Sequence, residues 1–288
     1  MARPDSLERL PDLTADAHRV ARLVLDEDGA RDLSTEVAGD PDGPASGVLV
    51  LRGRGVVAGL VYAEAVAAEA GCGIGWLAEA GQVLDSAGIG RISGSRRSML
   101  RAERPLLNLL QRASGVASQT RSFVDAIAGT GCTLLHTRKT MPGLRLFDIA
   151  AVVAGGGGVH RLDLAHTVMI KDNHWRVLRQ SGRSLASALA EARRQGALAC
   201  QVEVETEPQL REACEAGADR LLIDNQVPAT VAAWGTLARS LRPAIEIEAT
   251  GGITLANARD YASAGADYIS VGEITHSARA ADIALEFD

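Results

Sequence analysis

The sequence predicts an α/β protein in which a barrel of parallel strands follows an N-terminal α+β domain. Two observations predict the barrel: from about residue 133 onward, short β-rich runs alternate with longer segments of helical spacing, and each run ends in a polar residue. A third observation separates the N-terminal part, because residues 1–95 lack this alternation. The chain is therefore expected to hold two domains of different architecture.

Six β-rich runs define the predicted barrel. They are TLLHT (133–137), TVMIKD (167–172), CQVEVE (200–205), RLLIDN (220–225), AIEIEA (244–249) and DYISVG (267–272). The segments between them, such as SLASALAEARRQGA and EPQLREACEAGA, carry apolar residues three and four positions apart and end in Gly-Ala. Repeated strand–helix–strand units without an interrupting domain favour a closed barrel over an open sheet.

The N-terminal domain is expected to span residues 1–104, and the barrel domain residues 105–275. In the first, the stretch SGVLVLRGRGVVAGLVYA alternates short β-like pieces with turn residues, which indicates an antiparallel sheet. A helix is expected to begin at Pro105, because proline at the first helical position loses no needed hydrogen bond, and this places Arg104 at the helix entry. Residues 276–288 are a candidate for packing back on the first domain.

Composition limits the classes of function. The 288 residues carry a formal net charge of −6 and are 47% apolar, as expected of a soluble globular protein without a nucleic-acid or membrane partner. The four cysteines are scattered without a C-x-x-C pair, which argues against a zinc site or a disulfide framework. The charged N-terminus and the lack of an apolar run of about 18 residues predict a cytoplasmic location.

Charged residues cluster where the predicted strands end. In α/β barrels the working residues lie at the carboxyl ends of the strands. The residues at these ends are Arg138, Lys139, Lys171, Asp172, Glu203, Glu205, Asp224 and the Thr250–Gly252 triplet. The alternative is that they are charged loop residues that face water.

The same residues suggest which ligands would bind. Arg138, Lys139, Lys171 and, after the glycine run, Arg161 supply four cations that suit a polyanionic ligand. The carboxylates of Glu203 and Asp224 suit ribose hydroxyls or a phosphate-bound Mg²⁺. Gly251, Gly252 and Gly272 follow the last two strands, where such barrels often bind phosphate, although an ordinary turn is the alternative. The residues therefore describe a phosphorylated sugar beside a second anionic substrate.

Several long motifs follow one another over residues 102–277: AERPLLNLLQRASGVA, TRKTMPGLR, GGGGVHRLDL, IKDNH, VEVE, LLIDN, EATGGIT and YISVGEITHS. In this order they resemble the motifs of the quinolinate phosphoribosyltransferases, also called nicotinate-nucleotide pyrophosphorylases (carboxylating). The resemblance implies transfer of phosphoribose from phosphoribosyl pyrophosphate (PRPP) to quinolinate with decarboxylation, aided by Mg²⁺. It also implies an N-terminal open sandwich, a roughly seven-stranded incomplete barrel and a homodimer or higher homo-oligomer with shared active sites.

The resemblance also implies roles for individual residues. The quinolinate carboxylates are expected to be held by Arg104, reaching in from a neighbouring subunit, and by Arg138, His160, Arg161 and Lys171. Around the ribose and the pyrophosphate, the expected catalytic residues are Lys139, Lys171, Glu203 and Asp224, with the Mg²⁺ of PRPP near the two carboxylates. PRPP and its 5′-phosphate are expected to contact Thr137, Lys139, Thr250, Gly251, Gly252, Val271, Gly272, Glu273 and His276. His276 is alternatively a turn cap, and His174 is expected to orient Lys171.

Five positions depart from the usual pattern of this family. Ile149 and Ala150 stand where a Lys-Tyr pair is common, and Val159 stands for an asparagine; Gln201 and Glu273 replace an acidic and a small residue. Because the cations expected to grip the carboxylates are kept, one reading is neutral variation around the site. The alternative is a paralogue that acts on another pyridine or aromatic carboxylate. A barrel aldolase that forms a Schiff base at Lys139 or Lys171 is a further alternative, which the clustered cations disfavour. A binding protein without catalysis is the third.

Overall fold

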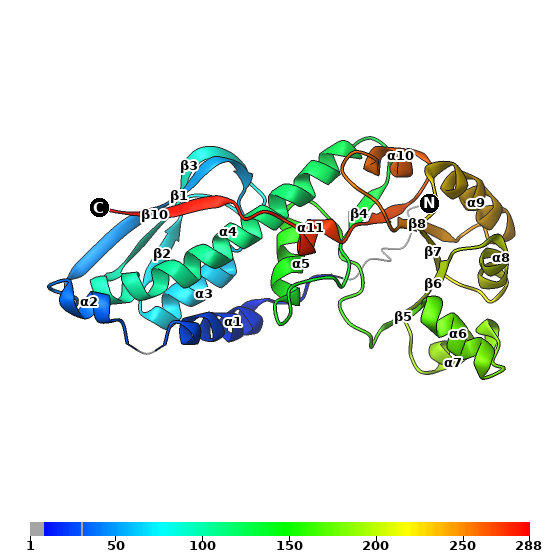
Figure 1. Cartoon of the computed structure of the whole chain (residues 1–288), viewed down its shortest axis with the longest axis horizontal. Coiled ribbons are helices and arrows are strands. Elements are labelled where there is room, and N and C mark those ends of the chain that lie inside the picture. Colours follow the sequence, from blue (N-terminus) through cyan, green and yellow to red (C-terminus); the bar gives the residue numbers. More distant parts are fainter. Residues whose placement is uncertain (1–8, 30) are drawn as a thin grey trace. The chain divides into compact units, whose positions relative to one another are not determined.

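The computed structural model describes residues 9–29 and 31–288, which form two compact units (Figure 1). The antiparallel-sheet unit comprises Arg9–Arg121, Arg138–Gly157 and Gly272–Asp288. The parallel-sheet unit comprises Ser122–Thr137 and Gly158–Val271. Each unit is therefore assembled from segments that alternate along the chain.

A four-stranded antiparallel sheet forms the centre of the first unit, as the N-terminal pattern predicts. Its strand order is β10-β1-β3-β2. The strands are β1 (Pro44–Val56), β2 (Gly73–Trp76), β3 (Val83–Ser95) and β10 (Asp282–Phe287). One face is buried through alternating residues such as Leu49 and Leu51 of β1, the pattern of a sheet with one solvated side. The C-terminal strand β10 pairs with β1, so the end of the chain returns to this sheet (Figure 1).

Helices complete the antiparallel-sheet unit. They are α1 (Thr14–Glu27), α2 (Leu33–Val37), α3 (Leu60–Ala70), α4 (Arg96–Ala126, of which residues up to 121 belong here), α5 (Arg145–Ala154) and α11 (Glu273–His276). Tyr62 of α3 and Phe147 of α5 pack edge to face, with ring centroids 4.9 Å apart. Throughout the described ranges, no helix combines the length and the apolar character that a membrane span needs.

Helix α4 begins earlier than the sequence predicts. The prediction that Pro105 is the first helical residue is wrong, because the helix starts at Arg96 and continues through this proline. The hydroxyl of Ser95 accepts a hydrogen bond from the backbone N–H of Ser98 (3.1 Å), a helix-capping contact at the true start. Arg104 therefore lies within the helix, on its exposed side, and the boundary expected at residues 104 and 105 falls inside α4.

The parallel-sheet unit contains all six predicted strands. Their order is β4-β9-β8-β7-β6-β5, and every ladder is parallel. The strands are β4 (Thr133–Leu135), β5 (Thr167–Ile170), β6 (Ala199–Val204), β7 (Arg220–Asp224), β8 (Glu246–Thr250) and β9 (Tyr268–Ser270). The connecting helices are α6 (Asp172–Gln180), α7 (Leu185–Arg194), α8 (Glu207–Glu215), α9 (Pro228–Leu241) and α10 (Ala258–Ser263).

Local signals start the connecting helices. Ser184 accepts a hydrogen bond from the N–H of Ser187 at the start of α7, and Thr206 accepts one from Gln209 at the start of α8. Pro228 begins α9, where its missing N–H is not needed. Helices α8 and α9 start within a few residues of the ends of β6 and β7, so the side chains at these junctions lie at the carboxyl edge of the sheet.

The closed barrel favoured by the repeats is not found. Among the described residues, β4 and β5 form no ladder with each other, and they are the two edges of the sheet. The segment between them holds α5 and the glycine run, and it contributes only a single bridge between Leu135 and Gly158. Glycine makes a poor strand interior, so this segment supplies no further strand to close a barrel. The unit is an α/β fold with an open, parallel sheet.

Candidate active site

Three predicted site residues meet at the carboxyl ends of β5, β6 and β7. Lys171 follows β5 directly, Glu203 lies near the end of β6, and Asp224 ends β7. The Lys171 ammonium forms an ion pair with the Glu203 carboxylate; its side chain is 41% exposed, whereas that of Glu203 is 8% exposed. The cluster thus has a buried anion at its base and a cation that reaches toward solvent.

The start of α6 holds Lys171 and Glu203 in place. The backbone N–H of Lys171 donates to Nδ1 of His174 (3.1 Å), so His174 caps the start of the helix through the backbone of Lys171. The indole N–H of Trp175 donates to the backbone carbonyl of Glu203 (2.9 Å). Both contacts tie the strand ends to one rigid helical turn, which limits the positions that the two charged groups can take.

The surroundings of the Asp224 carboxylate disfavour its negative charge. Burial raises its pKa, and the nearby charge of Glu203 raises it further, while Lys171 acts in the opposite direction. The side-chain amide of Asn225 donates to an Asp224 carboxylate oxygen (2.6 Å). A bound hydroxyl or cation would relieve the repulsion between the two carboxylates.

The turn after β8 requires glycine. Gly251 has a φ of +81°, and a Cβ atom there would lie 2.2 Å from Oδ1 of Asn225 and 2.8 Å from Oδ1 of Asp224. The backbone N–H of Asn225 donates to the carbonyl of Thr250 (3.0 Å), which links the ends of β7 and β8. The predicted phosphate turn of Thr250–Gly252 therefore lies directly beside the Asp224 carboxylate.

His160 and Arg161 are buried in the same unit, below these strand ends. Nδ1 of His160 accepts a hydrogen bond from the N–H of Arg161 (2.6 Å), so its Nε2 carries the proton and donates to Glu248 (3.1 Å). His160 is therefore occupied within the chain, and a grip on a substrate carboxylate would require its bond to Glu248 to break. Its backbone N–H in turn donates to Nε2 of buried His136 (3.0 Å).

Glu248 belongs to a buried ionic network that the sequence prediction missed. Arg220, 2% exposed, donates to Glu248 (3.1 Å) and to Glu246 (3.0 Å) and lies over the ring of Tyr268. Burial opposes the ionisation of Glu248, but His160 and Arg220 outweigh it and lower its pKa to about 2. Strand alternation could have revealed Glu248, because it lies two residues before Thr250 and shares its face of the sheet.

A second group of predicted residues lies in the antiparallel-sheet unit, around Gly272. A Cβ atom on Gly272 would lie 3.0 Å from Cδ of Lys139 and 3.1 Å from the His276 ring, so both side chains flank this residue. Glu273 accepts a hydrogen bond from the side-chain amide of Gln119 (3.0 Å). The structure therefore brings Lys139, Gly272 and His276 together and gives the unusual Glu273 a partner.

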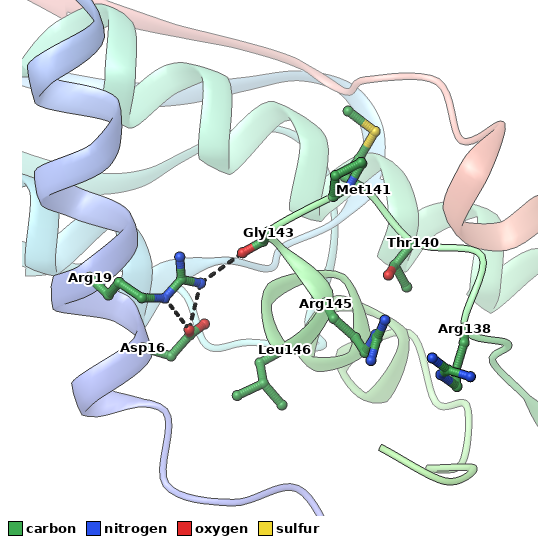
Figure 2. A pocket seen from close by; sticks show the side chains of 9 residues that line it. Asp16, Arg19, Arg138, Thr140, Met141, Gly143, Arg145 and Leu146 are labelled. Atoms are coloured by element: carbon green, nitrogen blue, oxygen red, sulfur yellow. Dashed lines mark hydrogen bonds and ion pairs between the residues drawn. The ribbon is translucent and has the colours of Figure 1, made fainter. Parts of the chain in front are cut away.

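A polar cavity of about 460 Å³ lies in the same unit and is lined in part by Arg138, Thr140 and Arg145. Figure 2 shows Arg138 and Arg145 at its wall, while Arg19 is held by Asp16 (2.7 Å) and by the carbonyl of Gly143 (2.7 Å). Within the described ranges Arg138 forms no ion pair, and its side chain is exposed. The cavity can therefore present a guanidinium to an anionic ligand.

The predicted site residues thus fall into two sets, one in each unit. The parallel-sheet unit holds Thr137, His160, Arg161, Lys171, Glu203, Asp224, Thr250, Gly251, Gly252 and Val271. The antiparallel-sheet unit holds Arg104, Arg138, Lys139, Gly272, Glu273 and His276. Within the described ranges, no group of three or more His, Cys, Asp or Glu side chains could hold a metal ion. Two carboxylates together with substrate phosphates would be a usual setting for Mg²⁺.

Comparisons with known proteins agree over both units. The family profile described as "Quinolinate phosphoribosyl transferase, N-terminal domain" matches residues 32–114, and the corresponding C-terminal domain matches residues 116–286. The chain is 36% identical to a nicotinate-nucleotide pyrophosphorylase (carboxylating) of Mycobacterium leprae over 96% of this chain and 99% of that protein. The human protein of the same name is 35% identical over 85% of this chain and 82% of its own length. A structure of the nicotinate-nucleotide pyrophosphorylase from Francisella tularensis superposes with a TM-score of 0.89 at 31% identity, covering 98% and 99% of the two chains.

Proposed function

The chain belongs to the quinolinate phosphoribosyltransferase family, and on that premise we propose that it transfers phosphoribose from PRPP to quinolinate. The products are nicotinate mononucleotide, pyrophosphate and CO₂, in the biosynthesis of NAD. One observation supports this reaction most directly: Lys171, Glu203 and Asp224 lie side by side at the carboxyl ends of β5, β6 and β7. This edge offers a cation to an anionic substrate and carboxylates to ribose hydroxyls.

The charges that develop during the reaction match the roles proposed for these residues. Departure of pyrophosphate leaves positive charge on the ribose carbon, which the carboxylates of Glu203 and Asp224 stabilise while they hold the hydroxyls. Lys139 and Lys171 stabilise the negative charge of the leaving group. The ring nitrogen of quinolinate attacks the ribose carbon and becomes a pyridinium. When CO₂ leaves, the electron pair of the broken carbon–carbon bond stays on the adjacent ring carbon, stabilised by the pyridinium, and that carbon takes up a proton from water. The protein needs no covalent nucleophile for either step.

The remaining proposals concern the groups around this centre. Arg138 and Arg161, together with Arg104, hold the acceptor carboxylates, and the backbone at Gly251, Gly252 and Gly272 approaches the 5′-phosphate closely. Mg²⁺ would arrive with the phosphates of PRPP, lie near Glu203 and Asp224, and supply positive charge for the leaving pyrophosphate. Burial and the charge of Glu203 raise the pKa of Asp224, which means that its surroundings disfavour the charged carboxylate. A bound cation or a donating hydroxyl would stabilise that charge.

Two finer aspects of the architecture stay part of this proposal. The open parallel sheet would correspond to the incomplete, roughly seven-stranded barrel that the family resemblance implies, and the antiparallel-sheet unit to its open sandwich. The likeness to the Francisella tularensis structure over nearly the whole chain supports both assignments. The cytoplasmic location stays a prediction.

Carbon dioxide release is the direct test of the reaction. The substrate is quinolinate labelled in the carboxylate adjacent to the ring nitrogen. With PRPP and Mg²⁺, the purified chain is expected to release this carboxylate as labelled CO₂ and to form nicotinate mononucleotide. Nicotinate, which lacks this carboxylate, serves as the matched acceptor that should not be turned over. Turnover of another pyridine or aromatic carboxylate without turnover of quinolinate would instead identify the chain as a paralogue, which the changes at Ile149, Ala150 and Val159 keep open.

A subunit-mixing experiment tests whether Arg104 of one subunit completes the active site of its neighbour. Arg104 is exposed on α4, where a neighbouring subunit of a homodimer could receive it. Chains carrying Arg104→Ala and chains carrying Lys139→Ala should each be inactive, and hybrids of the two should regain activity, because one site in each hybrid keeps both cations. Refolded mixtures of each variant with itself are the control. If hybrids form but stay inactive, the site lies within one chain.

A further inference from the structure

A partly buried ion pair connects two helices of the antiparallel-sheet unit near the proposed substrate loops. Arg112 of α4 grips the carboxylate of Asp148 of α5 with two parallel hydrogen bonds, from Nε to Oδ1 and from Nη2 to Oδ2, each of 3.0 Å. Asp148 is 0% exposed. Paired contacts of this kind between a guanidinium and a carboxylate are among the stronger and more directional hydrogen bonds in proteins.

Each partner of the pair also holds one loop. Oδ2 of Asp148 accepts a hydrogen bond from the backbone N–H of Met141 (2.9 Å), which lies in the loop that carries Arg138 and Lys139. Nη2 of Arg112 donates to the backbone carbonyl of Thr275 (2.9 Å), in the short helix that follows Gly272. The ion pair therefore bridges the loop of residues 138–144 and the segment of residues 272–276.

Thr275 joins the same two segments directly. Its side chain is fully buried, and its hydroxyl lies 2.8 Å from the carbonyl of Lys139 and 3.0 Å from that of Gly272. Since a hydroxyl has one proton, it can donate fully to only one of these carbonyls at a time. Either bond keeps the backbone of Lys139 beside Gly272, where the Lys139 side chain and the His276 ring already flank the glycine.

We infer that Arg112 and Asp148 are positioning residues, which hold the loop of Arg138 and Lys139 and the segment of Gly272 and His276 in one fixed arrangement. The inference rests on the proposed function, because these two segments carry the cations and the glycine assigned to the acceptor and to PRPP. Neither Arg112 nor Asp148 needs to touch a substrate. They act through backbone groups, and a displacement of about 1 Å at such groups can reduce the rate about a hundredfold.

The geometry explains why conservative replacements should fail at these positions. In Asp148→Asn, an oxygen at the Oδ2 position can still accept from Met141 and from Nη2 of Arg112, but the NH₂ group then faces the Nε–H donor of Arg112. The opposite rotamer turns the NH₂ group toward Met141 and Nη2, so either orientation breaks the paired contact, and the negative charge is lost in both. In Arg112→Lys the charge stays, but one ammonium cannot reproduce the planar fork and also reach the carbonyl of Thr275. Both variants preserve approximate size and therefore report on hydrogen-bond geometry more than on packing.

A second arginine–aspartate pair of similar design provides the matched control. Arg239 donates to Asp267 (2.9 Å) and to the backbone carbonyl of Gly265 (2.9 Å), and Asp267 accepts from the N–H of Ile247 (2.9 Å). This pair lies in the parallel-sheet unit at the amino ends of β8 and β9, at the opposite end of these strands from the proposed site. Arg239→Lys and Asp267→Asn should therefore cost stability without disturbing substrate loops.

The test compares these four variants of the full-length chain by amide hydrogen exchange and by steady-state kinetics, at a temperature where all are folded. Asp148→Asn and Arg112→Lys are expected to speed exchange in peptides covering residues 138–144 and 272–277 together. They should also lower kcat/KM for both quinolinate and PRPP by roughly tenfold or more. Both control variants should leave exchange in those peptides and kcat/KM close to the wild type, even where their melting temperatures fall equally.

Two results would overturn the inference: exchange that changes in only one of the two segments, and kinetic losses of the same size in the control pair. If Asp148→Asn does not fold, Arg112→Lys and the pair Thr275→Val and Thr275→Ser keep the test decisive. The serine variant retains the hydroxyl and should recover kcat/KM relative to the valine variant. The exchange measurement does not depend on turnover, so it decides the link between the segments even if the wild type proves inactive toward quinolinate.

Discussion

Replacing Arg220 with alanine is expected to lower the free energy of unfolding by about 3–5 kcal/mol, as is usual when one partner of a buried ion pair is removed. Arg220 is almost fully buried and forms ion pairs with two carboxylates, those of Glu246 and Glu248, and the Glu248 side chain is 0% exposed. The variant leaves both carboxylates inside the sheet without their cation and also removes the contact with the ring of Tyr268. Urea unfolding at pH 7 measures the effect.

The pH dependence and an exposed control distinguish this effect from a general loss of packing. In the wild type the pKa of Glu248 is lowered to about 2, so its favourable contribution is complete above about pH 4.3, the usual value for glutamate, and is lost as the pH falls toward 2. In Arg220→Ala the Glu248 carboxylate should take up a proton more easily, because the guanidinium that lowers its pKa is gone. The deficit should therefore shrink as the pH is lowered. Arg193→Ala breaks a solvent-exposed pair with Asp219 and should cost only about 0–1 kcal/mol. A deficit of Arg220→Ala that is small and independent of pH would contradict the ionic account.

Replacing Arg138 with alanine is expected to raise the KM for quinolinate much more than the KM for PRPP. Arg138 is exposed at the wall of the polar cavity, and the proposed function assigns it to a carboxylate of the acceptor. Loss of a charged hydrogen bond costs about 1.5–3 kcal/mol, or roughly 10- to 150-fold in affinity. Initial rates measured with each substrate varied in turn give the two constants.

A conservative and a remote variant sharpen this test. Arg138→Lys keeps the charge but loses the planar fork, so it should fall between the wild type and the alanine variant. Arg211→Ala removes an exposed arginine that pairs with Glu207 on α8, and it should leave both constants unchanged. Equal losses for quinolinate and PRPP in Arg138→Ala would contradict the assignment of this residue to the acceptor.

The strands of the parallel sheet could be predicted because each lies in a short β-rich run, and longer segments of helical spacing separate these runs. The start of α4 could not be predicted from Pro105. Proline at a helix start and proline within a helix look alike in a sequence, and the true start depends on the hydroxyl of Ser95. Closure of the barrel was also predicted wrongly, because the repeats show that strands are parallel but not whether the two edge strands meet.

The residues at the strand ends were easier to predict than the residues that are paired across helices. Lys171, Glu203 and Asp224 stand at strand ends, where position along the chain predicts neighbours across the sheet. Arg112 and Asp148 lie on different helices, 36 positions apart, and their pairing depends on how those helices pack. Likewise, no local pattern distinguishes buried His136, which accepts from the backbone of His160, from a histidine on the surface.

The pairing of the first and last strands has a consequence for how the chain folds. Ser46 and Asp288, 242 positions apart, are in contact where β1 meets β10, and the antiparallel-sheet unit is built from three separate segments of the chain. Such non-local contacts give a high contact order, and closing long loops before the contacts form slows folding. No single cut of the chain would release either unit intact. Because each unit consists of separate chain segments, neither unit corresponds to one continuous stretch of sequence that could be expressed alone.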